Sequence, residues 1–430
     1  MKTNRQPPLN PKSLNQKPLD QKPLDQKPLD QKPLTTTASL LKQINFTRIL
    51  SLLRYHPGLT RSELAQRTGL TRSTVTIITG ELIATGLIRE GQETVSGAAG
   101  GRPGTKLTLN PEGAFFIGAA IGDETLRVVE LSLAAQVTRR VQSPITDTHP
   151  AAIAKQLAAL LDRIWQANPQ GRERSRGIGI TVPGSLDREG IVLQAPRLQW
   201  HQVDLRPYLD LHVDLPLFIE NDANAGALAE MYLSGSMPGQ SLLYVFLGVG
   251  VGAGMVLHHR LLRGAGGTAC EISHLMIDPH SPQTSTDGLP GTLEALCSKD
   301  GLLNAYRQHS EESIDLDTLI LRLKQADPLA QKVVQQWGKY LSWGLRGIVG
   351  VLNPERIVFG GSLAVLLPDV QDQLNQQLQN CLPDGSGYRF DRTARFRLAI
   401  SKFEDGAAIG GAALVYQSLF QMPDLMLLHS

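Results

Sequence analysis

Three short segments in the second half of the chain carry side chains that can bind a polyhydroxylated ligand. In the first, Glu220-Asn221-Asp222-Ala223-Asn224-Ala225, an apolar strand is expected to end and a helix to begin. The carboxylate of Asp222 would then lie at a helix N-terminus, where it can accept a hydrogen bond from a hydroxyl group or, in an enzyme, take its proton. Helix capping is the plainer alternative, because Asn and Asp are favoured cap residues.

The second segment is rich in glycine and the third in hydrogen-bond acceptors. From Gly248 to Gly254, glycine alternates with other residues directly after an apolar strand, which lets backbone amides approach a phosphate or lets a hairpin turn tightly. Glu271 and His274, with Glu294 farther along, offer two carboxylates and an imidazole. These three side chains can contact a polyhydroxylated ligand or can be ordinary surface polar groups.

Short apolar strands alternate with helices after Gly113. This alternation predicts an α/β domain over residues 111–430, large enough to divide into two lobes. The expected strands are 115–121, 126–133, 177–181, 217–220, 242–247 and 356–359. The expected helices are 151–167, 223–233, 291–306, 329–352 and 406–420. The last two can supply contacts between copies of the chain or can form core, and their spacing does not decide.

Residues 37–110 have the pattern of a winged-helix domain. Apolar residues recur at helical spacing over 40–55. Thr60 then opens a second helix with a capping box to Glu63, and Gly69 is a natural helix end. Two short helices joined by a glycine-containing turn form a helix-turn-helix.

The third helix of this unit is the one expected to enter a DNA major groove. Thr71 caps it, and two strands at 87–89 and 106–109 flank the glycine-rich loop 97–104, which makes the wing. Arginine can grip guanine through two hydrogen bonds, short hydroxyls contact phosphates or base edges, and an arginine on a loop can enter a minor groove. The residues expected to contact DNA are Thr71, Arg72, Ser73, Thr74, Thr76 and Arg102.

The net charge of +2 is unevenly distributed along the chain. Residues 1–35 hold seven Lys and Arg against three Asp, and residues 36–110 hold nine against four Glu, which leaves −7 for the remainder. A basic front part on an acidic body is typical of a phosphate-binding module joined to another domain. Together with the helix-turn-helix, this charge favours DNA binding over the alternative of a winged helix that binds protein.

Residues 1–36 contain the repeat Gln-Lys-Pro-Leu-Asp and are expected to form a disordered, proline-rich arm, because proline at every fifth position prevents a continuous helix. The arm has no apolar signal-peptide core, and no window of the chain approaches the roughly 18 apolar residues of a membrane helix. Three cysteines without paired spacing suit a reducing compartment. We therefore expect a cytoplasmic protein without membrane contact.

Together, these segments resemble the ROK family of repressors, open reading frames and kinases. The matching stretches are Val182-Pro183-Gly184, the Trp200 region, 221–225, 248–254, 271–274, Leu293-Glu294 and Gly360-Gly361. The family implies an actin-like, two-lobed ATPase fold with a sugar in the cleft, and the winged helix places the chain among its regulators. The positions that match the family's sugar contacts are Asn221, Asp222, Glu271, His274 and Glu294, and the first carboxylate of this set also matches the catalytic base of the family's kinases.

The chain departs from those kinases at the turn that handles Mg²⁺ and phosphate. The kinases open with an Asp-Ile-Gly-Gly-Thr type of turn, and the corresponding stretch here, 118–125, has Ala120 in place of the Asp. Asp123 falls where the second glycine would be and is no evident replacement. Because phosphoryl transfer depends on positioning and charge neutralisation, this loss predicts that the protein is not an enzyme.

A second departure removes the zinc ligands of the family. The family follows its histidine with a Cys-x-Cys-Gly-x-x-Gly-Cys-Leu-Glu segment, and thiolates with histidine make a closed structural zinc site. Here Ser285, Asp287 and Thr292 replace the three cysteines. The sequence therefore predicts no bound metal and no cofactor, and leaves His274 either a ligand-binding or a structural role.

The sequence thus predicts a sequence-specific, DNA-binding transcriptional regulator, a repressor of sugar metabolism, controlled by a sugar or sugar derivative in a degenerate kinase cleft. Its expected partners are double-stranded operator DNA, a sugar or sugar phosphate effector, and further copies of the chain in a homodimer or higher oligomer. Two alternatives stay open. One is an ATP-dependent ROK sugar kinase with a DNA-binding arm, and the other is a regulator that senses a protein partner instead of a sugar.

Overall fold

The computed structural model describes residues 38–95, 104–209, 215–233, 241–258, 260–379, 381, 387–391, 395–403 and 405–420. The proline-rich arm and the wing tip with Arg102 lie outside these residues. None of the described helices is both long enough and apolar enough to cross a membrane.

The N-terminal part has the three helices and the small sheet that its capping residues predict. Helices α1 (Ala38–Tyr55), α2 (Arg61–Thr68) and α3 (Arg72–Ala84) pack on an antiparallel sheet in the order β1 (Leu59–Thr60), β3 (Gly104–Leu109), β2 (Ile88–Val95). Thr60 and Glu63 form the expected capping box, and α2 ends at Gly69 with a φ of 72°. Thr71 caps α3 by accepting a hydrogen bond from the Thr74 amide. The predicted winged helix is confirmed.

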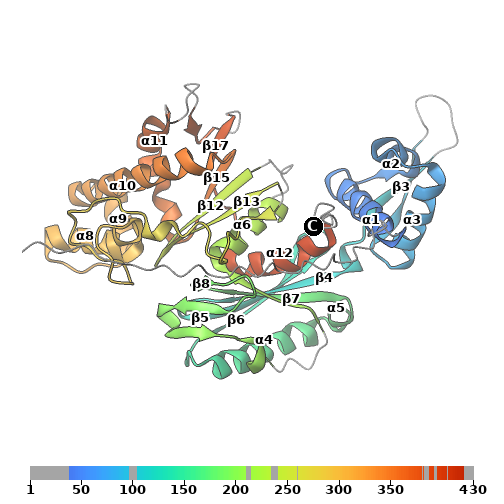
Figure 1. The fold of residues 1–430 in the computed structure, drawn as a ribbon, viewed down its shortest axis with the longest axis horizontal. Helices are drawn as coiled ribbons and strands as arrows, with labels where there is room; N and C mark the ends of the chain where they lie inside the picture. The colour runs from blue at the N-terminus through green and yellow to red at the C-terminus, as the bar shows by residue number, and fades with distance from the viewer. Residues whose placement is uncertain are drawn as a thin grey trace, which may run out of the picture.

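The first lobe of the remaining chain is built on a five-stranded sheet. Its order is β11 (Leu217–Asn221), β7 (Ser175–Val182), β4 (Phe115–Ile121), β5 (Thr125–Ser132), β6 (Val137–Pro144). The first three strands run parallel and the last two antiparallel. Helix α4 (Pro150–Ala167) covers one face of the sheet and α12 (Gly406–Phe420) covers the other (Figure 1). A small sheet of β8 (Ser185–Leu186), β9 (Val192–Ala195) and β10 (Trp200–Val203) follows β7 in the chain.

The second lobe is built on a six-stranded sheet. Its order is β14 (Arg260–Leu261), β13 (Val251–Leu257), β12 (Ser241–Leu247), β15 (Arg356–Gly360), β17 (Phe396–Ile400), β16 (Tyr388–Arg389). One face packs on α6 (Asp222–Leu233), which in turn packs on α12. The other face packs on α7 (Leu293–Cys297), α8 (Lys299–Ser310), α9 (Leu316–Lys324), α10 (Pro328–Leu352) and α11 (Leu367–Leu378). The predicted two-lobed α/β architecture is confirmed.

One continuous helix over 291–306 was predicted, and that prediction was wrong. The chain forms the short helix α7 and then α8, with Ser298 between them in an extended conformation. The Ser298 hydroxyl accepts a hydrogen bond from the Gly301 amide at 3.1 Å and so caps α8. Serine competes with the helical backbone for hydrogen bonds, which is why it favours a cap over a helix interior.

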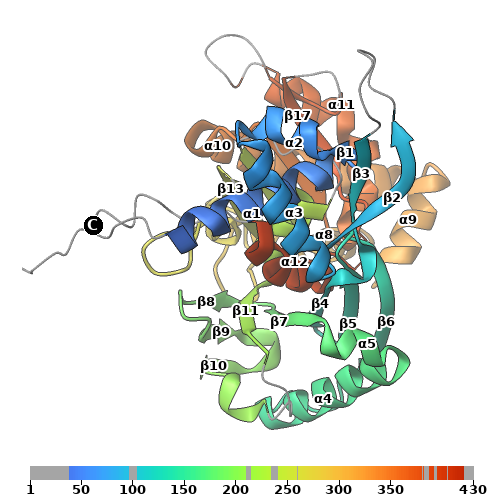
Figure 2. The ribbon, with the colours of Figure 1, turned by 90° about the vertical axis from the view of Figure 1, so that its right-hand side faces the viewer.

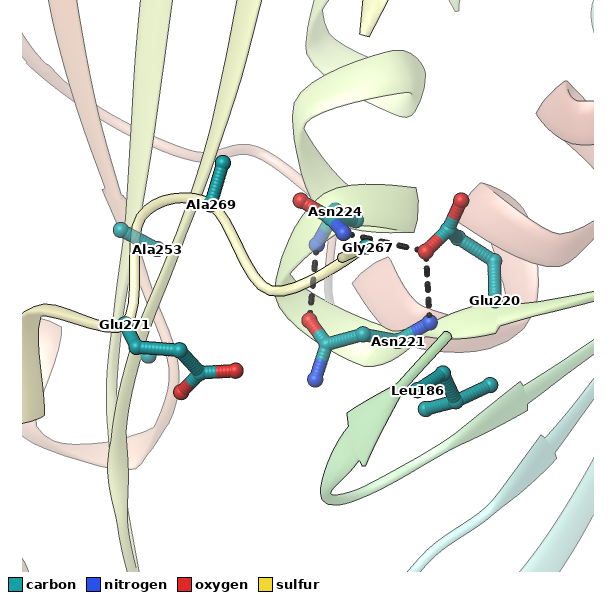
Figure 3. A pocket seen from close by; sticks show the side chains of 9 residues that line it. Leu186, Glu220, Asn221, Asn224, Ala253, Gly267, Ala269 and Glu271 are labelled. Atoms are coloured by element: carbon teal, nitrogen blue, oxygen red, sulfur yellow. Dashed lines mark hydrogen bonds between the residues drawn. The ribbon is translucent and has the colours of Figure 1, made fainter. Parts of the chain in front are cut away.

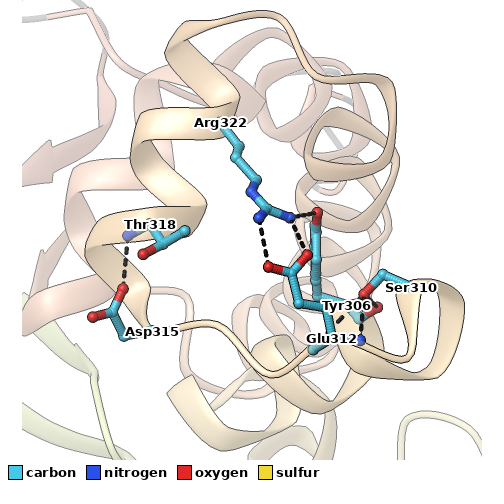
Figure 4. Close-up of polar contacts among 6 residues, drawn as sticks. All are labelled: Tyr306, Ser310, Glu312, Asp315, Thr318 and Arg322. Carbon is cyan, nitrogen blue, oxygen red and sulfur yellow. Dashed lines mark hydrogen bonds and ion pairs between the residues drawn. The ribbon is translucent and has the colours of Figure 1, made fainter.

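The corner between α8 and α9 is held by local polar contacts (Figure 4). The guanidinium of Arg322 donates to both carboxylate oxygens of Glu312, at 2.7 and 2.8 Å, and to the hydroxyl of Tyr306. Asp315 caps α9 by accepting from the Thr318 amide at 2.8 Å. These contacts stabilise the helical layer behind the second sheet.

Helix α12 belongs to the core, where it packs directly on the backbone of both lobes. A Cβ added at Gly411 would lie 2.6 Å from the carbonyl oxygen of Gly179 in β7. One added at Gly410 would lie 2.4 Å from the carbonyl carbon of Ala225 in α6. Only glycine allows such an approach. Of the two roles left open for residues 406–420, the structure therefore supports core.

Candidate ligand cleft and DNA-binding surface

A cleft with a cavity volume of about 710 Å³ opens between the two lobes. It is lined by the β4–β5 hairpin, the segment after β7, the N-termini of α6 and α12, and the turn after β12. Five residues from three separate segments, expected from the sequence to contact a ligand, all line this cleft: Asn221, Asp222, Glu271, His274 and Glu294.

Asn221 both caps α6 and faces the cleft. Its side-chain oxygen accepts from the amides of Ala223 and Asn224 at 2.8 and 3.0 Å, and its amide nitrogen donates to the carbonyl of Gly184 at 2.7 Å. The capping role weighed for this segment is thus present. It fixes the Asn221 side chain, which leaves one amide hydrogen for a ligand.

Asp222 is the most strongly perturbed acid of the cleft. Burial at the helix start, together with the nearby carboxylates of Asp123 and Glu271, raises the pKa of Asp222 to about 7. The Ala223 amide donates a hydrogen bond to this carboxylate and opposes part of the rise. Near neutral pH this side chain can therefore either accept or donate a hydrogen bond. A perturbed acid in a cleft is a common mark of a functional site.

A partly buried ion pair supports these residues from behind, and Figure 3 shows its acidic partner, Glu220, beside Asn221 and Asn224. Glu220, 6% exposed, accepts from the Asn221 amide and the Asn224 side-chain nitrogen, both at 3.0 Å. Its other oxygen pairs with Arg263 at 2.8 and 3.0 Å. Arg263 thereby joins the loop that leads to Glu271 to the start of α6. This loop, α6 and β13 also enclose a smaller pocket of about 20 Å³ beside the cleft.

The third segment brings several carboxylates together. Partial burial raises the pKa of Glu271, the charge of His274 opposes this rise, and the carboxylates of Asp287 and Glu294 add to it. Glu294 is itself oriented by the Thr286 amide, which donates to its carboxylate at 3.2 Å. This side of the cleft therefore offers several acceptors for hydroxyl groups.

The same segment does not fit the zinc site that the resemblance implies. His274 Nε2 lies 3.6 Å from the carboxylate of Asp287, which replaces one thiolate. Cys297 is fully buried against the Trp337 carbonyl. Within the described ranges, no three side chains of His, Cys, Asp or Glu gather so that they could hold a metal ion. His274 and Asp287 form a polar pair instead.

The glycine-rich segment is a hairpin. The Gly248 amide donates to the Gly250 carbonyl at 3.0 Å, and β12 and β13 continue antiparallel on either side. A Cβ added at Gly254 would lie 2.6 Å from the carbonyl oxygen of Ala223, so this glycine lets α6 approach β13. Of the two roles open for 248–254, the structure shows the tight turn.

Arg197 links the two lobes across the cleft. Ala120 lies in the cleft wall where the related kinases have Asp, and the neighbouring Asp123 is 3.9 Å from the Arg197 guanidinium. The same guanidinium lies 3.3 Å from both the Asp300 carboxylate and the Val249 carbonyl in the second lobe. Arg197 and Arg263 could not be predicted from the sequence, because their partners Asp300 and Glu220 lie 103 and 43 residues away in the chain and no local pattern marks them.

The predicted DNA contacts that the structure describes lie on the N-terminal turns of α3. The Thr71 hydroxyl accepts from the Thr74 amide and contacts the hydroxyls of Ser73 and Thr74 at 2.9 and 2.8 Å. Thr76 donates to the Arg72 carbonyl at 2.8 Å. Capping and exposure thus coexist here, since all five residues except half-buried Thr74 are exposed.

One exposed apolar residue on α3 was not among the predicted contacts. Ile77 is 62% exposed and lies one turn beyond Ser73 on the same face. Gly80 follows one turn later, and a Cβ there would meet open space. Along its exposed face, α3 therefore presents an arginine and hydroxyl groups in its first turn, the apolar side chain of Ile77 in the next, and exposed backbone at Gly80.

Comparison with known proteins agrees with this architecture. A model of the ROK family matches residues 116–418, and one described as winged helix-turn-helix DNA-binding matches residues 47–89. The xylose repressor of Caldicellulosiruptor bescii is 26% identical over 409 residues, which cover 90% of this chain and 98% of that protein. The glucokinase of Halalkalibacterium halodurans is 27% identical over 323 residues, 70% of this chain and 95% of that protein.

A solved structure shows the same likeness for the whole arrangement. The crystal structure of a ROK family transcriptional regulator, a homologue of the E. coli MLC protein, matches with a TM-score of 0.72 at 28% identity and covers 88% of this chain and 97% of that one. The family model spans well over half of the chain. This protein therefore belongs to the ROK family and carries a winged helix-turn-helix DNA-binding domain before its two-lobed ROK domain.

Proposed function

We propose that this protein is a DNA-binding transcriptional repressor of sugar metabolism whose operator affinity changes when a neutral sugar binds in the cleft. The observation that carries the proposal is the presence, in one chain, of an exposed helix-turn-helix and a cleft lined with an amide, an imidazole and carboxylates. The xylose repressor of C. bescii, similar over nearly its whole length, supports both halves of it.

The charges of the cleft favour a neutral sugar over a sugar phosphate. Arg127 lies 3.8 Å from Asp405, which also pairs with Arg140 at 3.2 Å, and Arg197 lies near Asp123 and Asp300, so each arginine of the cleft already faces a carboxylate. A phosphate would add negative charge within a few ångströms of several carboxylates, and like charges at that distance repel even where water partly screens them. Among the described lining residues, two arginines stand against six acids: Asp123, Asp222, Glu271, Asp287, Glu294 and Asp405.

The polar residues can divide the hydroxyls of a sugar between them. The ionised form of Asp222 accepts from one or two hydroxyls, and Glu271 and Glu294 accept from others. Asn221 donates its remaining amide hydrogen, and His274 donates or accepts through its imidazole. A sugar that bridges residues of both lobes favours a closed cleft, because it binds that state more tightly.

We propose further that the cleft does not phosphorylate its sugar. Ala120 supplies no carboxylate for Mg²⁺, and Asp123 is held by Arg197. The second candidate function is a sugar kinase, favoured by similarity to the H. halodurans glucokinase and by the pKa of Asp222, which suits a general base. Purified protein is expected to transfer no phosphate from ATP–Mg²⁺ to any hexose. Transfer that Asp222→Asn abolishes would establish the kinase instead.

On the DNA side, α3 is proposed to enter the major groove. Arg72 is placed to reach guanine, and the hydroxyls of Ser73 and Thr76 to reach phosphates or base edges. A symmetric dimer would present two such helices to two half-sites about one helical turn apart. Arg102 is proposed to add a minor-groove contact from the wing.

A thermal-shift screen tests the effector. The pure protein is heated with d-xylose, d-glucose, N-acetyl-d-glucosamine and their phosphates, with and without ATP–Mg²⁺. A neutral sugar at about 100 times its Kd should stabilise the protein by about 2.7 kcal/mol. The effect should disappear in Asp222→Ala. A shift with phosphates alone contradicts the neutral effector, and no shift with any sugar favours a protein partner.

A further inference from the structure

Arg54, in the last turn of α1, inserts its guanidinium among aromatic rings of the ROK domain. Its Cζ lies 5.0 Å from the ring centre of Tyr416, 5.2 Å from that of Phe420 and 5.9 Å from that of Tyr232. The ring of its chain neighbour Tyr55 is 4.9 Å away. We call the rings of Tyr232, Tyr416 and Phe420 the aromatic cage. Figures 1 and 2 show α1 of the DNA-binding domain beside α12.

Within the described part of the chain, Arg54 makes no ion pair with a carboxylate, so the rings are its partners. The ring of Tyr416 is fully buried and stacks on that of Phe420 at 4.6 Å, and its hydroxyl donates to the Leu133 carbonyl at 3.2 Å. Arg54 is half-buried, and partial burial strengthens the attraction between a guanidinium and aromatic faces, since water competes less for the charge. The cage is therefore a specific contact between the two domains.

Both helices that carry the cage begin at the ligand cleft. Helix α6 starts at Asp222 and carries Tyr232 near its end, whereas α12 starts at Gly406, in the cleft wall, and ends at Phe420. Each helix spans about 20 Å at 1.5 Å per residue. The two pack without space between them at Gly410, so a shift at their common start is carried to their common end.

We propose that Arg54 is the residue through which sugar binding changes DNA affinity. This inference rests on the proposed function. A sugar held at the start of α6 sets the position of α6 and α12, the cage moves with these helices, and Arg54 transfers the displacement to α1 and thus to the recognition helix. The cage therefore has two positions, one in the sugar-bound and one in the sugar-free protein, and sugar and operator DNA each bind one of them more tightly than the other.

The test compares Arg54→Met with Lys42→Met. Methionine keeps most of the apolar stem of arginine and removes the charge from the cage. Lys42 lies on the same helix, is 53% exposed and pairs with Glu81 inside the DNA-binding domain, so its variant loses one charge of α1 without touching the cage. The DNA probe is a duplex selected from a random library by the full-length wild-type protein. The sugar is the one that gives the largest thermal shift.

The measured quantity is the ratio of operator Kd with and without saturating sugar. Wild type and Lys42→Met should show a ratio of about 5–150, the usual range of allosteric coupling. Arg54→Met should lower that ratio below about 3 while it binds sugar, in the absence of DNA, as tightly as wild type. Arg54→Lys, which restores the charge, should recover part of the coupling.

The other possible results distinguish a failure of the role of Arg54 from a failure of the proposed function. Full coupling in Arg54→Met overturns the role of Arg54 and leaves the proposed function intact. No coupling in the wild type with any sugar overturns the proposed function and this inference with it. If Arg54→Met does not fold, Phe420→Leu removes one ring of the cage instead. Unchanged coupling in that variant contradicts the inference.

Discussion

Replacing Asp222 by Asn is expected to stabilise the ligand-free protein at pH 8 and to leave its stability unchanged at pH 4. In the folded protein, burial and two neighbouring carboxylates raise the pKa of Asp222 to about 7, from an ordinary value of 3.8. The folded state therefore holds this proton more tightly than the unfolded chain does. The resulting stability is complete below about pH 4 and is lost as the pH rises through about 7.

The size of the effect follows from this difference in pKa. It corresponds to at most about 4 kcal/mol at 1.36 kcal/mol for each tenfold change in proton affinity. Water in the open cleft screens the charge, so we expect about 1–2 kcal/mol in the free energy of unfolding. Urea unfolding of wild type and Asp222→Asn at intervals from pH 4 to pH 8 measures it, since other titrating groups are common to both proteins.

The same substitution should weaken sugar binding. A hydrogen bond to a charged acceptor contributes about 1.5–3 kcal/mol, which is roughly a tenfold to a hundredfold change in Kd. Stability and affinity should thus change in opposite directions at pH 8. Parallel pH profiles of unfolding for the two proteins would refute the raised pKa, and unchanged sugar affinity would refute the ligand role of Asp222.

Three further predictions concern packing and DNA contact. Gly411→Ala should lower the free energy of unfolding by about 1–3 kcal/mol, measured by urea unfolding, because the added Cβ would meet backbone atoms. The control Gly347→Ala, at an exposed position of α10, should be neutral or stabilising by up to about 1 kcal/mol. Equal effects of the two substitutions would contradict the close packing of α12. Thr71→Ala should lower the free energy of unfolding by about 1 kcal/mol and weaken operator binding, measured by fluorescence anisotropy, because α3 loses its N-terminal cap. A stability and an operator affinity equal to those of the wild type would rule out this role of Thr71. If Ile77 contacts the methyl group of a thymine in the selected operator, replacing that thymine by uracil, which lacks the methyl group, should weaken binding by the wild type but not by Ile77→Ala. The same loss of affinity in both proteins would exclude a contact between Ile77 and the thymine methyl group.

Elements with local signals could be predicted from the sequence. Thr60, Glu63 and Gly69 lie within ten positions, and each acts through its own backbone neighbourhood, so α2 was predicted with both of its ends. The β4 strand was predicted with its observed bounds, because a buried strand shows as an uninterrupted apolar run. Ser298 misled the prediction, since a serine between two helical stretches does not by itself show whether the helix continues.

Features that depend on tertiary contacts could not be predicted. The ion pair of Glu220 with Arg263 and the placement of Arg54 among Tyr416 and Phe420 join residues far apart in the chain. Periodicity shows which face of a helix is buried, not what it meets. For the same reason the sequence left α12 open between core and oligomer contact, and the backbone contacts of Gly411 decided for core.

The cleft retains much of what a kinase would need for the sugar and little of what it would need for phosphate. Asp222 still lies at the start of α6, and its raised pKa would suit a base. Ala120, however, provides no carboxylate, and the arginines of the cleft are paired with acids. In the proposed function, binding a sugar without converting it would let the bound state last as long as the sugar is present.

The most direct test of the account is a titration of operator DNA against the full-length protein with and without the stabilising sugar. Saturating sugar should weaken operator binding by about 5–150-fold, and saturating operator should weaken sugar binding by the same factor. An operator Kd that is identical at zero and saturating sugar, although the sugar binds, would contradict the account.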